Sequence, residues 1–384
     1  MQHRQLSLLA LAITSALFQI NAQAEETLPS GEEAKRLDTV LVTGTRGTAR
    51  TVLDSPVPVD VLTAADLKAT GASNGELGQA LQTLLPSFSM PRQSNSGGAD
   101  HIRAAQLRGM SPDQVLVLVN GKRRHTSALV NDSSKIGRGT APVDFNSIPI
   151  SPIKRIEVLR DGAGAQNGSD AIAGVINIIL DDAPEGGEVS TTYGAYHTHQ
   201  DAIGRTTTDG QNSLTTAKGG VRLGEDGGFL RGGAEYKERN PTNRAGFDGF
   251  DATPGQRNYV MGDGSARDVN LWFNGSLPLG ERELYSFGTW NERHSTGAQF
   301  YRYPYEQPQF YPNGYLPQSL GTNQDLSATA GFKGLLADGW DFDSSVTHGR
   351  NRFESATRRT LNVSLGADSP TRFLTGHYEL PQTT

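Results

Sequence analysis

The second half of the chain, residues 183–384, alternates between apolar and polar residues in a way that strongly restricts its fold. In Leu230–Arg239, apolar or small residues occupy every second position and charged residues lie mainly between them. Two further segments alternate in the same manner, Val269–Leu277 and Leu326–Leu336. A period of two is typical of β-strands with one apolar and one polar face. This half is therefore predicted to be an antiparallel β-sheet.

The connections between these segments also alternate in length. Tight turns are predicted at 224–228, 278–281 and 337–339, and long loops at 197–211, 241–266 and 297–324. Tight turns at one end of a sheet and long loops at the other are typical of an outer-membrane β-barrel. A soluble β-sandwich is the alternative, but its turn signals would recur every 8–12 residues or so.

The N-terminus, residues 1–24, has the three parts of a secretory signal peptide. His3 and Arg4 precede an apolar stretch from Leu6 to Ile20, and Ala22-Gln23-Ala24 resembles a cleavage site. An amphipathic helix is disfavoured because the apolar residues surround the helix instead of forming one stripe. No later stretch reaches about 18 apolar residues, so the sequence predicts membrane insertion only through strands.

Several functional classes are disfavoured by composition. A net charge of -6 argues against nucleic-acid binding, and the absence of cysteine excludes disulfides, thiolate metal sites and cysteine nucleophiles. The G-x-G-x-x-x-G run at Gly162–Gly168 lacks the following helix of a dinucleotide site. No nucleophile–base set is recognisable. We therefore expect no catalytic residue, cofactor or metal, and no enzymatic activity.

Residues 47–182 show mixed helical and strand signals and are predicted to form a small α+β domain. Helices are expected at Thr63–Lys68, with Thr63 and Asp66 as a capping box, and after Asn74 as a cap. The expected strands are Val57–Leu62, His101–Arg108, Gln114–Val119, Arg155–Arg160 and Gly174–Leu180.

Two clusters are candidates for ligand contact. The first is Lys122-Arg123-Arg124-His125, which would bind phosphate or an anionic ligand or, as is more common, form a solvated loop or pair with acidic groups. The second is an aromatic run in a long loop, which would form a recognition surface, a self-packed loop or part of an aromatic girdle. Its members are Phe300, Tyr301, Tyr303, Tyr305, Phe310, Tyr311 and Tyr315.

A β-prone segment, Leu37–Gly44, lies in the polar stretch that follows the signal peptide. It is either the first strand of the next domain or a segment that adds as a strand to another protein's sheet.

Taken together, these segments resemble the TonB-dependent outer-membrane receptors. Asp38-Thr39-Val40-Leu41-Val42-Thr43-Gly44 resembles the TonB box of that family. The segments that resemble its plug domain are Gln106–Met110, Val115–Arg123, Ile153–Gly162 and Asn167–Ile179. Asn167 departs from the aromatic residue usual there. The resemblance implies a signal peptide (1–24), a linker with the TonB box (25–46), an α+β plug domain (47–182) and the first part of an antiparallel transmembrane β-barrel (183–384).

The resemblance also implies a function. Such a protein takes up a scarce large nutrient across the outer membrane of a Gram-negative bacterium, such as an iron–siderophore complex, cobalamin or a saccharide. Its partners are TonB, outer-membrane lipid and the ligand. The TonB contact would involve Asp38, Thr39, Val40, Leu41 and Val42. Plug apices near 92–99 and 123–138 and the aromatic loop would contact the ligand, through Arg92, Gln93, Arg123, Arg124, His125, Tyr301, Tyr303, Tyr305 and Tyr311.

Length is the main departure from the family. About seven or eight strands fit after residue 183, whereas the large plugged barrels have about 22. The chain is therefore expected to be an N-terminal fragment or a truncated product. The alternative function is that of an exported, non-transporting protein that binds only TonB or ligand.

Overall fold

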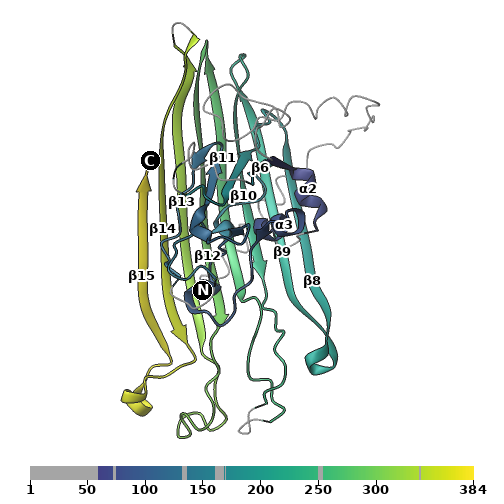
Figure 1. The fold of residues 1–384 in the computed structure, drawn as a ribbon, viewed down its shortest axis with the longest axis vertical. Coiled ribbons are helices and arrows are strands. Elements are labelled where there is room, and N and C mark those ends of the chain that lie inside the picture. Colours follow the sequence, from purple (N-terminus) through teal and green to yellow (C-terminus); the bar gives the residue numbers. More distant parts are fainter. Residues whose placement is uncertain are drawn as a thin grey trace, which may run out of the picture. The chain divides into compact units, whose positions relative to one another are not determined.

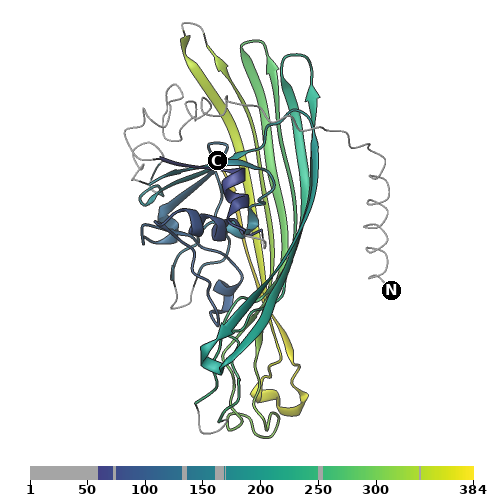
Figure 2. The same ribbon diagram turned by 90° about the vertical axis from the view of Figure 1, so that its right-hand side faces the viewer.

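The fold is taken from a computed structural model that describes residues 59–71, 75–131, 136–160, 168, 170–249, 254–336 and 339–384. These residues form an α+β plug domain and a long antiparallel sheet, which we call the wall (Figure 1). Figure 2 shows the plug domain against the concave side of the wall.

The plug domain is built on a five-stranded sheet in the order β1-β6-β7-β4-β5. β4 and β7 pair in parallel, and the other neighbours are antiparallel. The strands are β1 (Val59–Thr63), β4 (Val115–Val119), β5 (Lys122–Arg123), β6 (Ile153–Leu159) and β7 (Gly174–Leu180). All five residues of β4 are buried, as its apolar sequence predicts.

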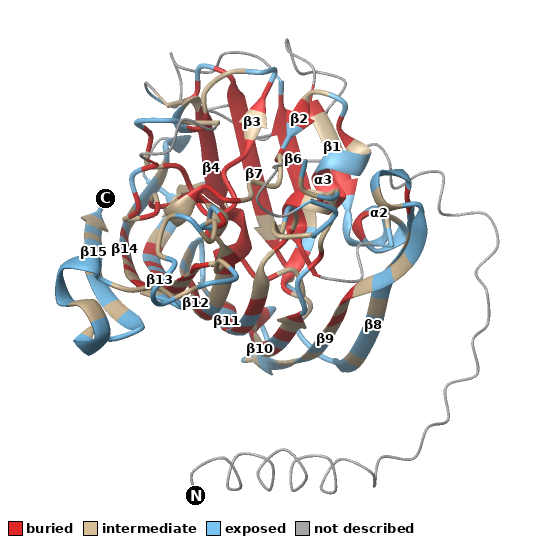
Figure 3. Ribbon diagram, turned by 90° about the horizontal axis from the view of Figure 1, so that it is seen from below, coloured by how far each residue is buried: buried red, intermediate tan, exposed pale blue. Residues whose placement is uncertain are grey.

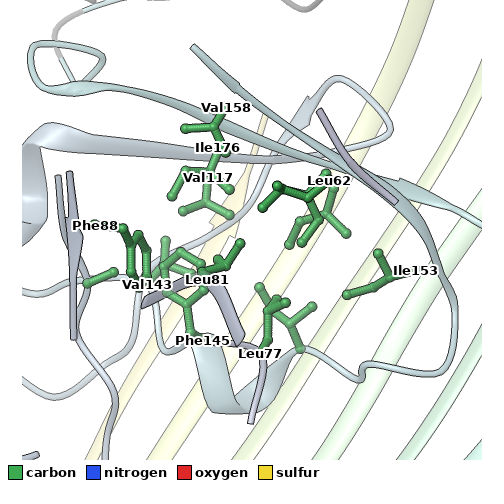
Figure 4. Close-up of a cluster of buried hydrophobic side chains, with 14 of the residues drawn as sticks. Leu62, Leu77, Leu81, Phe88, Val117, Val143, Phe145, Ile153, Val158 and Ile176 are labelled. Carbon is green, nitrogen blue, oxygen red and sulfur yellow. The ribbon is translucent and has the colours of Figure 1, made fainter. Parts of the chain in front are cut away.

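Two short helices follow β1. Helix α2 (Ala64–Ala69) begins at the predicted capping box, in which the Thr63 side chain accepts a hydrogen bond from the Asp66 N–H. Helix α3 (Leu77–Leu84) buries Leu77, Ala80 and Leu81 in the core. Its N-cap is Glu76, and Asn74 lies outside the described residues. Leu77 and Leu81 meet side chains of β1, β4, β6 and β7 in one apolar cluster (Figure 4).

The predicted strand His101–Arg108 is wrong for most of its length. Only β3 (Gln106–Leu107) is a strand, and it pairs with β2 (Phe88–Ser89). His101 and Arg103 are buried and use their polar groups in side-chain contacts instead of a ladder. Arg108 then has a φ of 57°, which turns the chain away from extended backbone.

The wall is an eight-stranded antiparallel meander in the order β15-β14-β13-β12-β11-β10-β9-β8 that does not close on itself. This agrees with the predicted partial barrel. Its strands are β8 (Gly187–Gln200), β9 (Arg205–Leu223), β10 (Gly228–Arg239), β11 (Ser265–Leu279), β12 (Arg282–Ala298), β13 (Gln318–Leu335), β14 (Asp341–Arg358) and β15 (Arg372–Thr383).

The connections follow the predicted alternation with one correction. The long loop expected at 197–211 is instead a short hairpin connection, at Asp201–Gly204, between extended strands. The ends of these two strands were not predicted because both of their faces are rich in polar residues. The threonine-rich start of β9 pairs with the histidine-rich end of β8, and His197 hydrogen-bonds Thr208 at 2.8 Å.

The two faces of the wall differ as the sequence pattern predicts. Arg231, Glu235 and Asn270 point to the plug domain and are buried, whereas Leu230 and Leu271 point away and are about half exposed. In Figure 3, bands of buried and exposed residues alternate along the middle strands of the wall. No helix among the described residues is both long enough and apolar enough to cross a membrane.

Candidate functional site

The candidate ligand site lies where an apex loop of the plug domain meets the long loop that connects β10 to β11, and this wall loop in turn packs Tyr259 against Tyr301 of the loop that connects β12 to β13. The apex loop contains Arg92–Ala99, and the wall loops connect β10 to β11 and β12 to β13. Asn95 donates a hydrogen bond to the Val260 carbonyl at 3.2 Å. Ser94 Oγ accepts one from the Gly262 N–H at 3.1 Å. The plug apex and the loop that connects β10 to β11 are therefore neighbours.

A run of tyrosine rings in contact with one another forms the aromatic part of this site. Ring centroids lie 6.2 Å apart for Tyr259 and Tyr301, and 5.2 Å apart for Tyr301 and Tyr303 in an edge-to-face contact. Tyr303 and Tyr305 stack at 5.8 Å. Tyr301 is buried and Tyr305 is 61% exposed, so the run extends from the loop interior to solvent. Three of the predicted contact residues thus lie together.

Burial, with hydrogen bonding to Asp248, raises the pKa of Tyr303 above its ordinary range. The hydroxyl therefore stays neutral and can donate or accept a hydrogen bond. Tyr311 belongs to a separate pair with Tyr315, at 4.0 Å between centroids. Tyr259 was not predicted, because an isolated tyrosine in a polar loop carries no pattern.

Arg92 and Gln93 lie at the base of the apex loop. Arg92 forms ion pairs with Asp263 and with Glu76, the latter at 3.1 Å. The Oε1 atom of Gln93 is buried and finds no hydrogen-bond partner among the described residues. Ligand contact by Arg92 and Gln93 stays a prediction.

The basic cluster pairs with acidic groups, which was the alternative to ligand binding. Lys122 Nζ lies 2.8 Å from Asp343, and Arg123 pairs with Asp170. Arg124 and His125 both contact Asp325 of β13, and His125 Nε2 lies 2.9 Å from it. Arg124 and His125 are buried between the plug domain and the wall. Ligand contact by this cluster stays a prediction.

Buried ion pairs join the plug domain to the wall. Glu76 contacts Arg239 of β10, and Arg103 lies 3.1 Å from Asp263. Arg293 of β12 lies 2.8 Å from Asp144. The alternation in Leu230–Arg239 predicts the charged face of β10 but not the plug residues that pair with the wall, because single acidic residues in loops carry no periodic signal.

The charges control the protonation of two plug residues. Burial alone would raise the pKa of Glu76, but Arg239, Arg103 and Arg92 hold it far below its usual value. Burial, with Arg103 and Arg293 nearby, lowers the pKa of His101 to about 4. Neutral His101 hydrogen-bonds Ser295 at 2.7 Å and Ser319 at 3.1 Å. Near neutral pH, Glu76 is therefore ionised and His101 is neutral, and both of these states favour the docked plug domain.

No group of three or more potential metal ligands occurs in the part of the chain that the structure describes. The predicted TonB-contact residues, Asp38 to Val42, lie outside that part.

The chain is similar in sequence and in fold to known proteins. The TonB-dependent Receptor Plug Domain family matches residues 51–175. The ferric enterobactin receptor PirA of Pseudomonas aeruginosa is 34% identical over 170 residues, which cover 44% of this chain and 21% of that protein. The vitamin B12 transporter BtuB of Vibrio vulnificus is 32% identical over 193 residues, which cover 50% of this chain and 28% of that protein.

A solved structure of the ferric enterobactin receptor of Pseudomonas aeruginosa, a mutant in complex with enterobactin, has the same fold. It is 21% identical, with a TM-score of 0.54 over 85% of this chain and 45% of that chain. The chain thus spans about a quarter of the curated relatives' length and less than half of this solved chain.

Proposed function

We propose, from the premise that residues 51–175 form a TonB-dependent receptor plug domain, that the chain belongs to a transporter in the outer membrane of a Gram-negative bacterium. It would take up a scarce large nutrient at the expense of energy delivered through TonB. The observation that carries this proposal is a wall with an apolar outer face that holds a plug domain by buried charges. Such a wall suits lipid on one side and a polar plug on the other.

The ligand would bind between the tyrosine run and the Arg92–Ala99 apex. Tyrosine rings stack on flat groups, and hydroxyl and amide groups add hydrogen bonds. The relatives named for ferric enterobactin and vitamin B12 support a siderophore or cobalamin as the ligand class. A saccharide would also stack on tyrosine. TonB would pair as a strand with Asp38–Val42, and outer-membrane lipid would cover the apolar face.

The test measures uptake in two strains. In one the gene is deleted, and in the other the deletion is complemented by the gene on a plasmid. Radiolabelled ferric enterobactin, radiolabelled cobalamin and a labelled oligosaccharide are supplied in turn, with and without functional TonB. Uptake of one of them that needs both the gene and TonB is expected. Uptake that needs the gene but not TonB would overturn the proposed mechanism.

A second candidate function is binding of TonB or ligand without transport, which an unclosed wall of the eight described strands would still allow. Open edges in lipid leave backbone groups unsatisfied. Immunoblotting of outer membranes against the plug domain, with and without boiling, separates the two functions. A heat-shifted band near twice 41.2 kDa supports transport, and a band near 41.2 kDa without a shift supports binding alone.

A further inference from the structure

The apolar outward face of the wall ends on an arginine at the end of the sheet where the tight turns lie. On β11 the outward residues from Val269 to Leu279 are apolar or glycine. At a rise of about 3.4 Å per residue and a strand tilt of about 40°, this stretch spans about 25 Å, the height of the apolar band of an outer-membrane barrel. The direct partner of Leu279 on β12 is Arg282. Arg282 therefore lies at the limit of the band that is nearest the tight turns, which we call the turn edge.

Aromatic rings lie beside Arg282 at the turn edge. Its guanidinium carbon is 5.8 Å from the centroid of the Phe332 ring, a cation–π contact. The ring centroids of Phe332 and Phe342 are 5.6 Å apart. Trp340, which precedes β14, is 73% exposed. Aromatic residues form the girdles of a barrel where the hydrocarbon meets the lipid head groups, so the turn edge has the composition of such an interface.

Gly334 of β13 leaves room for the arginine side chain. It is the direct partner of Arg282, and a Cβ at Gly334 would lie 2.9 Å from Arg282 Cγ. The side chain of Arg282 therefore lies over a position without a side chain and reaches Phe332, the next outward residue of the same strand. The aliphatic part of the arginine is packed on the wall, and its charged end remains at the surface.

Arg282 differs from the arginine at the opposite limit of the band because it has no carboxylate partner. At that opposite limit, Arg267 lies 3.1 Å from Glu238. Within the residues that the structure describes, Arg282 forms no ion pair. Glu283 is next in the chain, but it lies on the inner face and is 3.2 Å from Lys333. The positive charge of Arg282 is therefore not compensated by a carboxylate of the wall.

We propose that Arg282 binds the phosphate group of an anionic phospholipid in the periplasmic leaflet of the outer membrane. This inference rests on the membrane placement proposed above, which puts the tight turns on the periplasmic side. Outside the protein, the groups at the limit of the hydrocarbon are lipid head groups, and a guanidinium binds phosphate through two parallel hydrogen bonds. An acyl chain of the same lipid would cover Leu279 and Leu284, which are 52% and 47% exposed.

The test measures lipid binding through the fluorescence of Trp340. The full chain is purified in detergent with Trp290→Phe, which removes the other outward tryptophan; Trp272 is buried. It is titrated with phosphatidylglycerol brominated on its acyl chains, which quenches nearby tryptophan. We expect Arg282→Gln to weaken binding about tenfold and Arg282→Lys, which keeps the charge without the planar fork, to weaken it less. The control Arg267→Gln should leave the affinity unchanged.

Equal affinity of Arg282→Gln and the parent chain would overturn the proposal. Brominated phosphatidylcholine should bind several-fold more weakly, and equal affinity for the two lipids would overturn the preference for an anionic lipid. Displacement of phosphatidylglycerol by equimolar inorganic phosphate would assign the site to a free anion and overturn the lipid. Membrane placement is read separately, by pelleting after carbonate extraction. A chain that pellets but shows no effect of Arg282→Gln refutes only the lipid site, whereas a chain that does not pellet refutes the membrane placement as well.

Discussion

The Arg293 guanidinium of wall strand β12 lies 2.8 Å from the Asp144 carboxylate of the plug domain, and both side chains are almost fully buried. The same guanidinium donates to Asp268 of β11 at 2.6 Å. One arginine therefore compensates two buried carboxylates that come from the two parts of the molecule. The ion pair therefore links the wall directly to the plug domain.

Removal of this arginine should loosen the plug domain. In Arg293→Gln, Asp144 and Asp268 lose their buried countercharge, and docking should weaken by about 3–5 kcal/mol. Hydrogen exchange of residues 142–148 measures the change. The control Arg267→Gln breaks an exposed pair with Glu238 and should cost at most about 1 kcal/mol. Equal exchange in the two variants would contradict the assigned role of Arg293.

Acid should weaken the docking of the plug domain through His101. Its pKa is about 4 in the folded chain against an ordinary 6.5, so the unfolded chain binds more protons between these values. The contribution of neutral His101 to the stability of the docked plug domain is complete above pH 6.5 and is lost as pH falls toward 4. It amounts to roughly 3 kcal/mol at most. Glu76, whose pKa lies below its ordinary 4.5, adds a loss of the same sign at lower pH.

The measurement for this prediction is protease sensitivity of the plug domain across that pH range. His101→Gln keeps hydrogen-bonding groups for Ser295 and Ser319 but does not titrate. It should flatten the profile between pH 6.5 and 4. An unchanged slope in His101→Gln would show that other groups carry the pH dependence.

Gly349 of β14 should not tolerate a side chain. A Cβ there would overlap the His125 imidazole, so Gly349→Ala must displace a residue that contacts Asp325. Overpacking of this kind costs about 1–3 kcal/mol, measured as a lower thermal midpoint of the plug domain. The control Gly249→Ala meets no heavy atom within 4 Å and should leave the midpoint unchanged. A similar midpoint in both variants would contradict close packing at Gly349.

The sequence predicted those elements whose pattern is periodic. The alternation of Leu230 and Arg231 located β10 and both of its faces, and the apolar run Val115–Val119 located β4. The end of β8 escaped notice because its histidines and threonines alternate without an apolar face. The partners of Glu76 and Arg293 could not be predicted, since these contacts join loop residues to strands far away in the chain.

Ligand affinity should depend on the tyrosine run. Tyr303 lies between Tyr301 and Tyr305, so Tyr303→Ala interrupts the run and should weaken ligand binding roughly tenfold. Equilibrium binding of the labelled nutrient measures this. The control Tyr193→Ala alters an exposed tyrosine on β8 and should leave affinity unchanged. Equal affinities would place the ligand elsewhere.

Energy coupling should depend on the backbone of the segment Asp38–Val42. If this segment pairs as an added strand with TonB, each N–H on the paired edge donates a hydrogen bond. Val40→Pro removes one donor and fixes φ. We expect energised uptake in the full-length protein to fall strongly, while equilibrium binding of the ligand stays the same, because the proposed ligand site consists of the plug apex and the outer loops and does not include this segment.

Val40→Thr is the matched variant for this experiment. Threonine has nearly the same shape and β-branching as valine and keeps the backbone N–H, so uptake should remain close to that of the unchanged protein. Loss of uptake in Val40→Pro alone therefore identifies the backbone as the element that TonB recognises. Loss in both variants would instead assign recognition to the valine side chain, and full uptake in both would remove this segment from the coupling mechanism.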